Sequence, residues 1–177
     1  MFTASKAAGK PEAVFLNIVW SGLEHIYKAV KALEAERISG MGMTPERVRD
    51  FSYCSFGSEP GDDLVCNYFL WYASACYNFI QVFSKAFSPA EKLDAEFGNI
   101  ITWRHKVSAH PSWVWPKGDS MASQQMSICL FPEFSDGHFQ VGGVVICSPT
   151  HGQSCDEWCW CLVKEHERLK TLVTKYL

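Results

Sequence analysis

The chain has 177 residues, of which 47% are hydrophobic and 20% charged, which is the balance of a globular protein rather than of a disordered one. This length suits a single domain over residues 1–177, which can bury roughly two-thirds of its unfolded surface. The net charge of −3 gives no overall basic field for nucleic acid or an anionic membrane, so a nucleic-acid site would need a local group of cations.

The first residues and the cysteines indicate a compartment. Residues 1–6 contain no apolar segment of the kind found in signal peptides, which predicts a cytoplasmic protein. Two of the eight cysteines, Cys66 and Cys76, fall in the most apolar stretch of the chain, where a free thiol behaves as a small hydrophobic group. We therefore expect free thiols rather than a disulfide framework.

Residues 12–37 have the periodicity of an amphipathic helix. The segment from Ser39 to Gly42 is expected to end this helix, and Thr44-Pro45-Glu46 to open a short helix that reaches about Phe51. Residues 54–61 have the composition of a loop. The apolar stripe of the first helix comprises Phe15, Ile18, Val19, Gly22, Leu23, Ile26, Val30 and Leu33, and the opposite side comprises Asn17, Glu24, Lys28, Lys31 and Glu34.

The segment 64–83 is apolar almost all the way round. Its length would suit a membrane span, but Asn67, Asn78 and Gln81 interrupt it and no basic flank marks a cytoplasmic side. We therefore expect a central helix surrounded by other helices, and no membrane contact.

A further helix is predicted from the capping box Ser88-Pro89-Ala90-Glu91. It is expected to end near His110, because Pro111 disfavours helical geometry in the residue before it. Its inward stripe comprises Leu93, Phe97, Ile100, Ile101 and Val107.

The periodicity changes to two after residue 124, which predicts a β-hairpin over residues 125–147. Ser135-Asp136-Gly137 supplies its turn, and Gly142-Gly143 indicates a bulge in the return strand. The spacing in Ser154-Cys155-Asp156-Glu157 predicts a last helix over 154–177, with an apolar stripe of Trp158, Leu162, Leu169, Leu172, Val173 and Tyr176. The fold class is mainly α: a helical bundle core over 12–114, with the hairpin inserted before the C-terminal helix.

Arg104 is the most informative residue for chemistry. At 100° per residue it points in nearly the same direction as Phe97 and Ile100, into the predicted bundle. A guanidinium stays charged, so burial requires an acidic partner, a polar cleft or a second subunit. His110 follows six residues later, where the end of the helix could turn it toward Arg104.

This pattern resembles the R-x(4–6)-H motif of HEPN (higher eukaryotes and prokaryotes nucleotide-binding) domains. Arg104 and His110 match with five residues between them, and His105 takes the place where that family often has a polar residue. The aromatic segment 68–75 is similar to the bundle core of such proteins. The resemblance covers about residues 12–114 and leaves out the hairpin and the last helix.

The resemblance implies a metal-independent endoribonuclease that works as a homodimer, in which two Arg–His pairs meet. Histidine titrates near neutral pH and suits proton transfer from the RNA 2′-hydroxyl, while a planar guanidinium suits the phosphate. Other members of the family are inactive and bind a partner protein instead. Trp103, Trp113 and Trp115 could stack on an RNA base or pack in the core.

Structural interpretations of the same residues stay open. Arg104 could pair with Asp62, Asp63 or Asp94, His110 could cap a helix and His105 could be solvated. The cysteines Cys155, Cys159 and Cys161, with His151 upstream, lack the Cys-x2-Cys spacing of a zinc knuckle. We therefore expect neither a metal nor another cofactor.

Overall fold

The structure is a computed structural model, and it describes residues 11–42, 52–54, 62–87, 97–104, 125–127, 131–142, 144–148, 152–156 and 160–174. Its helices are α1 (Glu12–Met41), α3 (Asp62–Ala86), α5 (Gly98–Arg104) and α6 (Leu162–Thr174). Its strands are β1 (Ser52–Cys54), β2 (Gln125–Ser127), β3 (Phe131–Ser135), β4 (His138–Gly142), β5 (Val144–Ser148) and β6 (Gly152–Asp156). The described part is mostly helical, as the sequence predicts, with more strands than expected.

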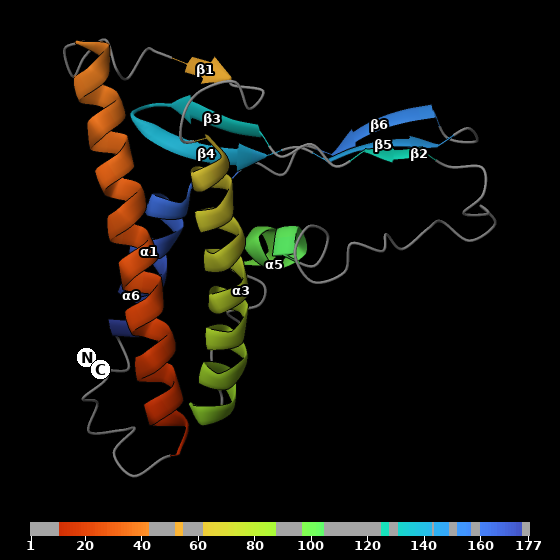
Figure 1. The fold of residues 1–177 in the computed structure, drawn as a ribbon. Coiled ribbons are helices and arrows are strands. Elements are labelled where there is room, and N and C mark those ends of the chain that lie inside the picture. The colour runs from red at the N-terminus through yellow and green to blue at the C-terminus, as the bar shows by residue number, and fades with distance from the viewer. Residues whose placement is uncertain are drawn as a thin grey trace.

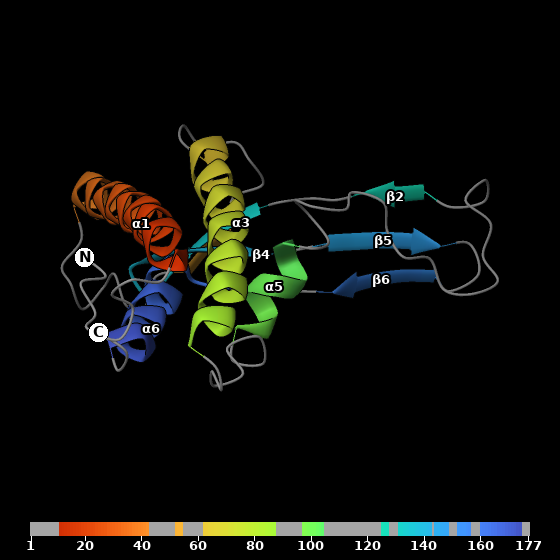
Figure 2. The same cartoon turned by 90° about the horizontal axis from the view of Figure 1, so that it is seen from below.

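The helices surround one core. The long helices α1 and α3 run antiparallel and pack together, α6 packs on α1, and α5 lies beside α3 on the side away from α1 (Figures 1 and 2). The largest fully buried side chains come from these helices and from β3: Tyr72, Phe69, Phe79, Phe83, Phe97, Phe134, Leu16, Leu23, Ile80 and Ile100. Phe97 and Ile100 belong to the inward stripe that the sequence predicts for the third long helix.

The buried face of α1 differs from the predicted stripe. Leu16 and Leu23 are fully buried, whereas Phe15 and Ile18 are 42% and 67% exposed. The buried positions are Leu16, Trp20, Leu23, Val30 and Glu34, which follow steps of three, four and seven residues. The predicted stripe was wrong at Phe15, Ile18 and Gly22, because an almost equally apolar set of residues lies one position away.

The end of α1 is as predicted. Gly42 adopts a left-handed conformation (φ 58°), and its N–H bonds to the carbonyl of Ser39. Glycine takes this conformation without the steric cost of a Cβ atom, so it stops the helix. The predicted short helix from Thr44 to Phe51 lies outside the described residues.

Helix α3 has the predicted position but is not covered on every side. Val65, Phe69 and Phe79 are buried, whereas Leu64 and Trp71 are 41% and 56% exposed. The expectation of a helix surrounded by others is therefore wrong for one face. No helix that the structure describes is long and apolar enough to span a membrane.

The predicted hairpin is present as the inner part of a larger β structure. Strands β3 and β4 pair around Asp136 and Gly137, whose positive φ angles of 54° and 74° fit a tight hairpin turn. Phe131 lies opposite Gly142, and Ser127 lies opposite Val145. Ser127 and Phe131 are four residues apart, whereas their partners Val145 and Gly142 are three apart, so the extra residue belongs to the outgoing strand. The bulge predicted in the return strand at Gly142-Gly143 was therefore wrong, and Gly143 itself lies outside the described residues.

Two antiparallel sheets result, in the orders β1-β3-β4 and β2-β5-β6. The second sheet extends away from the helices (Figure 1). Strands β1 and β6 were not expected. The predicted start of the last helix at Ser154 was wrong, because residues Gly152–Asp156 pair with β5 and α6 begins at Leu162. The capping-box spacing at Ser154 is a local helix signal, but the pairing of Gly152–Asp156 with β5 overrides it.

Strand β4 and α6 are joined at Trp160. Its backbone pairs with Val141, and its indole is buried against Phe69 at 4.6 Å between ring centres. This contact connects the β3–β4 hairpin to the helical core and fixes where α6 begins.

Candidate functional site

Arg104 is the last residue of α5 and lies against α3. Its guanidinium carbon is 4.2 Å from the centre of the Tyr77 ring. The helix is anchored by Phe97 and Ile100, each 1% exposed in the core. A guanidinium over an aromatic face is worth roughly 0.5–2 kcal/mol, depending on its desolvation. Packing against Tyr77 therefore helps to hold the side chain in place.

The guanidinium of Arg104 has an unsatisfied donor. Its Nε atom is buried and makes no hydrogen bond, and within the described residues no carboxylate pairs with it. By contrast, Arg168 lies 3.4 Å from Glu165. The side chains of Asp62, Asp63 and Asp94, the acidic partners considered from the sequence, lie outside the part of the chain that the structure describes. A half-buried cation with an unused donor is suited to holding an anion.

The other predicted site residues, His105 and His110, lie outside the described residues. The same holds for the side chains of Trp103, Trp113 and Trp115. Of the predicted triad, the structure therefore locates Arg104 alone. The convergence of Arg104 with the histidines stays a prediction.

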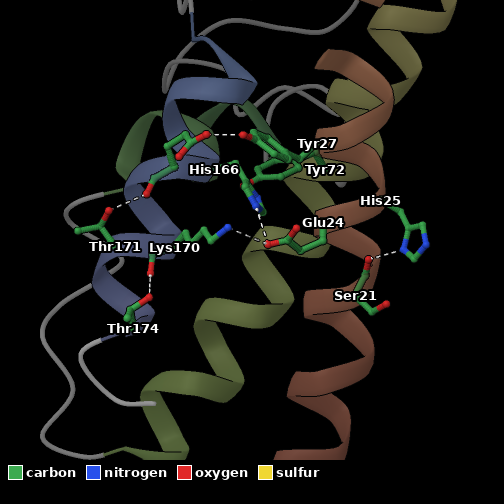
Figure 3. A network of polar contacts seen from close by, with 10 residues as sticks. Ser21, Glu24, His25, Tyr27, Tyr72, His166, Lys170, Thr171 and Thr174 are labelled. Atoms are coloured by element: carbon green, nitrogen blue, oxygen red, sulfur yellow. Dashed lines mark hydrogen bonds and ion pairs between the residues drawn. The ribbon is translucent and has the colours of Figure 1, made fainter. Parts of the chain in front are cut away.

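A second group of polar side chains, which the sequence analysis missed, lies between α1, α3 and α6. His166 on α6 is fully buried, with its ring stacked on Tyr27 at 4.3 Å and on Trp20 at 5.3 Å. Its Nδ1 lies 3.1 Å from the hydroxyl of the buried Tyr72, and its Nε2 lies 3.5 Å from Glu24 Oε1 (Figure 3). Three helices thus meet around one imidazole.

The hydrogen-bond roles in this group follow from the carboxylate. Glu24 can only accept, so the neutral tautomer with its proton on Nε2 faces Glu24 and leaves Nδ1 to accept from the Tyr72 hydroxyl. The contact with Glu24 does not have hydrogen-bond geometry and acts as an electrostatic attraction. Lys170 lies 3.7 Å from the same carboxylate oxygen, so the charge of Glu24 is shared between α1 and α6.

Burial sets the protonation of this group. It lowers the pKa of His166 below its usual 6.5, against the opposing attraction of Glu24. Burial also raises the pKa of Tyr72 well above 10. At neutral pH the imidazole and the phenol are therefore both uncharged. On the solvent side, a hydrogen bond to Glu167 raises the pKa of Tyr27 to about 12, with burial adding to it.

A tyrosine–histidine–carboxylate series has the groups needed for proton transfer, but this one is closed. Tyr72 and His166 have no exposed surface, so no substrate atom can reach them. The arrangement joins three helices and is not an active site. Its signal in the sequence is the spacing Leu162, His166, Leu169, Val173, which places a histidine in the middle of an apolar stripe.

Glu34 is a second buried polar residue that the sequence pattern misplaces. It is 4% exposed and accepts a hydrogen bond from the backbone N–H of Phe139 at 3.0 Å and one from His138 Nδ1 at 3.2 Å. Desolvation raises the pKa of its carboxyl, opposed by these two partners. Glu34 therefore fixes the β3–β4 hairpin to α1. Its role is structural.

Among the described residues, thiols and metal ligands add no further site. Cys66, Cys76 and Cys161 form no disulfide, and burial raises the pKa of the Cys76 and Cys161 thiols, which keeps them protonated and unreactive. The residues that the structure describes contain no group of three His, Cys, Asp or Glu side chains that could hold a metal ion. Arg104 on Tyr77 is thus the candidate site.

Comparisons of the chain with protein-family models, with curated proteins and with solved structures find no match. The HEPN resemblance therefore rests on the spacing of Arg104 and His110 in a helical context.

Proposed function

We propose that the chain is a HEPN-like domain in which Arg104 holds an RNA phosphate and His110, assisted by His105, transfers the proton for metal-independent cleavage. The observation that supports this proposal is the state of Arg104: it is stacked on Tyr77, half-buried, and has a buried Nε without a hydrogen-bond partner.

The geometry of the stack suits phosphate. A guanidinium whose flat face lies on an aromatic ring keeps its N–H donors pointing outward in its own plane. There they can form two parallel hydrogen bonds to phosphate oxygens. Arg168, an exposed arginine 5.0 Å from the centre of the Phe97 ring, pairs its guanidinium with Glu165, whereas the described residues supply no such carboxylate to Arg104. Because Nε is itself buried, an incoming anion would bind to the part of the half-buried guanidinium that stays exposed.

The proposed reaction needs no metal. A histidine takes the proton of the 2′-hydroxyl, the 2′-oxygen attacks the adjacent phosphorus, and the 5′-oxygen of the next nucleotide leaves with a proton from a second acid. Two protomers of a homodimer would supply one His110 each, as base and as acid. The products are a 2′,3′-cyclic phosphate and a free 5′-hydroxyl. Arg104 stabilises the charge that builds up on the phosphate oxygens.

A non-catalytic interaction module is the second candidate. It is favoured by the apolar side chains that α1 exposes near its start, since Val14 and Ile18 are 66% and 67% exposed and lie one helical turn apart. In that case Arg104 would bind an anionic group of a partner without any chemical step.

Cleavage of RNA by the purified protein in the presence of a chelator distinguishes the two candidates. We expect wild-type protein to yield cyclic-phosphate ends and to leave DNA intact, and His110→Ala to reduce the rate roughly 10²–10⁴-fold. Arg104→Lys keeps the charge but loses the paired donors, so it should also be slower. Equal cleavage by wild type and His110→Ala would reveal a contaminating nuclease, and no cleavage by wild type would favour the interaction module.

A further inference from the structure

Helix α3 exposes a stripe that the core does not use, formed by Leu64, Asn67, Trp71, Asn78 and Lys85, here called the α3 stripe. Four of these residues follow one another at steps of seven, nearly two helical turns, so they share one face. Trp71 is 56% exposed and Leu64 is 41% exposed. From Leu64 to Lys85 the stripe is about 32 Å long.

The charge of this face differs from that of the whole chain. The protein has 19 acidic and 16 basic residues, yet α3 has no acidic residue after Asp63. Lys85 lies at the end of the stripe, and Arg104 lies over Tyr77, which points about 100° round the helix from the stripe residue Asn78. Figure 1 shows α5, which ends in Arg104, directly beside α3. Beyond Asp62 and Asp63 at the start of α3, an anionic chain along this helix would meet a cation at Lys85 and no carboxylate of α3 itself.

The central residue of the stripe is a prepared aromatic surface. The ring of Tyr68 meets Trp71 edge-on, at 5.7 Å between centres and 83° between planes. This contact uses the edge-to-face geometry that aromatic pairs prefer and orients the indole. Asn67 and Asn78 are exposed on either side of it, and their amides can donate to and accept from the edges of a base.

We propose that the α3 stripe binds single-stranded RNA, with an unpaired base stacked on Trp71 and the phosphates directed toward Lys85 and Arg104. This inference rests on the proposed function and names the form of its substrate. Stacking needs an accessible base, and bases inside a duplex are covered by their neighbours. A protein partner could use the exposed Leu64 and Trp71, but it would not require the cations Lys85 and Arg104 near the far end of the helix.

The test is binding of a mixed-sequence single-stranded RNA in which every 2′-hydroxyl is methylated, so that cleavage cannot occur. We expect Trp71→Ala to weaken binding about five- to 150-fold, the measured range for loss of one stacked base. Trp71→Phe keeps a stacking ring and should bind nearly as wild type. Lys85→Ala should lower the slope of log affinity against log salt by about 0.7, whereas Lys28→Ala, an exposed lysine on α1, should leave it unchanged.

The outcomes separate the two proposals. Binding of the methylated RNA by wild type, without cleavage of ordinary RNA, would keep the α3 stripe and overturn the ribonuclease. Cleavage of ordinary RNA, together with equal binding of the methylated RNA by Trp71→Ala and wild type, would keep the ribonuclease and overturn the α3 stripe. Equal affinity for duplex and single strands, or no binding by wild type, would overturn the stripe proposal.

Discussion

At the scale of residues, His166 is a buried titrating group in the described part of the chain, and its protonation ties stability to pH. It is enclosed by Tyr27 and Glu24 of α1 and by Tyr72 of α3, while Glu167 and Lys170 are its charged neighbours on α6. Because burial lowers the pKa of His166 below 6.5, the unfolded chain takes up this proton before the folded protein does. Its contribution to stability is therefore complete above about pH 6.5 and is lost as the pH falls toward the folded-state pKa.

We predict that the free energy of unfolding of the wild type declines between about pH 7 and pH 5 by up to about 1.4 kcal/mol per pH unit more than that of His166→Gln. The glutamine keeps an acceptor near Tyr72 but does not titrate. Urea denaturation of both proteins across this range measures the difference. The raised carboxyl pKa values of Glu34 and Glu165 act in the opposite direction and cancel in the comparison. A pH-independent difference between the two proteins would contradict the prediction.

At the scale of elements, the register of α1 gives a direct test of its packing. The structure buries Leu16 fully and exposes Ile18, the reverse of the predicted stripe. Leu16→Ala should lower the free energy of unfolding by about 2–5 kcal/mol, because it leaves a cavity against α3. Ile18→Ala should change the free energy of unfolding by no more than about 0.5 kcal/mol at a protein concentration low enough for the monomer, where no second copy covers Ile18. Denaturant unfolding of the two variants measures both changes in the free energy of unfolding. A larger loss of stability for Ile18→Ala than for Leu16→Ala would support the predicted apolar stripe and contradict the buried face of α1 in the structure.

The positions of the elements could be predicted from the sequence better than their faces. The start of α1, its end at Gly42 and the turn at Asp136-Gly137 follow from local rules, and the structure has all three. The stripes of α1 and α3 were harder to predict, because these helices carry apolar residues on more than one side. The pairing of residues 152–156 with β5 depends on a partner strand, so the local capping signal at Ser154 was misleading.

The candidate site could be predicted only in part, because its contacts join residues that are far apart in the sequence. Arg104 was found from its motif, whereas its contact with Tyr77 joins residues from two helices and no local pattern shows it. His166 and Glu34 were missed because the environment that makes them buried comes from segments far apart in the sequence. Trp71 was assigned to the core from apolarity alone, although it lies on an exposed face.

At the scale of the whole molecule, the proposed reaction needs two copies of the chain, because one His110 cannot be base and acid in the same step. The exposed Val14, Phe15 and Ile18 on α1 give the protein apolar surface that a second copy could cover. We predict a symmetric homodimer at micromolar concentration, with twice the chain mass of 20.0 kDa in light scattering. A clean monomer mass would contradict the dimeric site.

The central claim is that Arg104 is an anion-holding group and not a structural one, and NMR of the arginine Nε–H groups tests it most directly. The Arg104 signal, identified by its loss in Arg104→Lys, should shift when the methylated single-stranded RNA is added, because a phosphate bound to the exposed part of the guanidinium changes the electrostatic environment of Nε. The signal of Arg168, whose Nη1 already pairs with Glu165, should stay in place. An Arg104 signal that does not move at saturating RNA would contradict the claim.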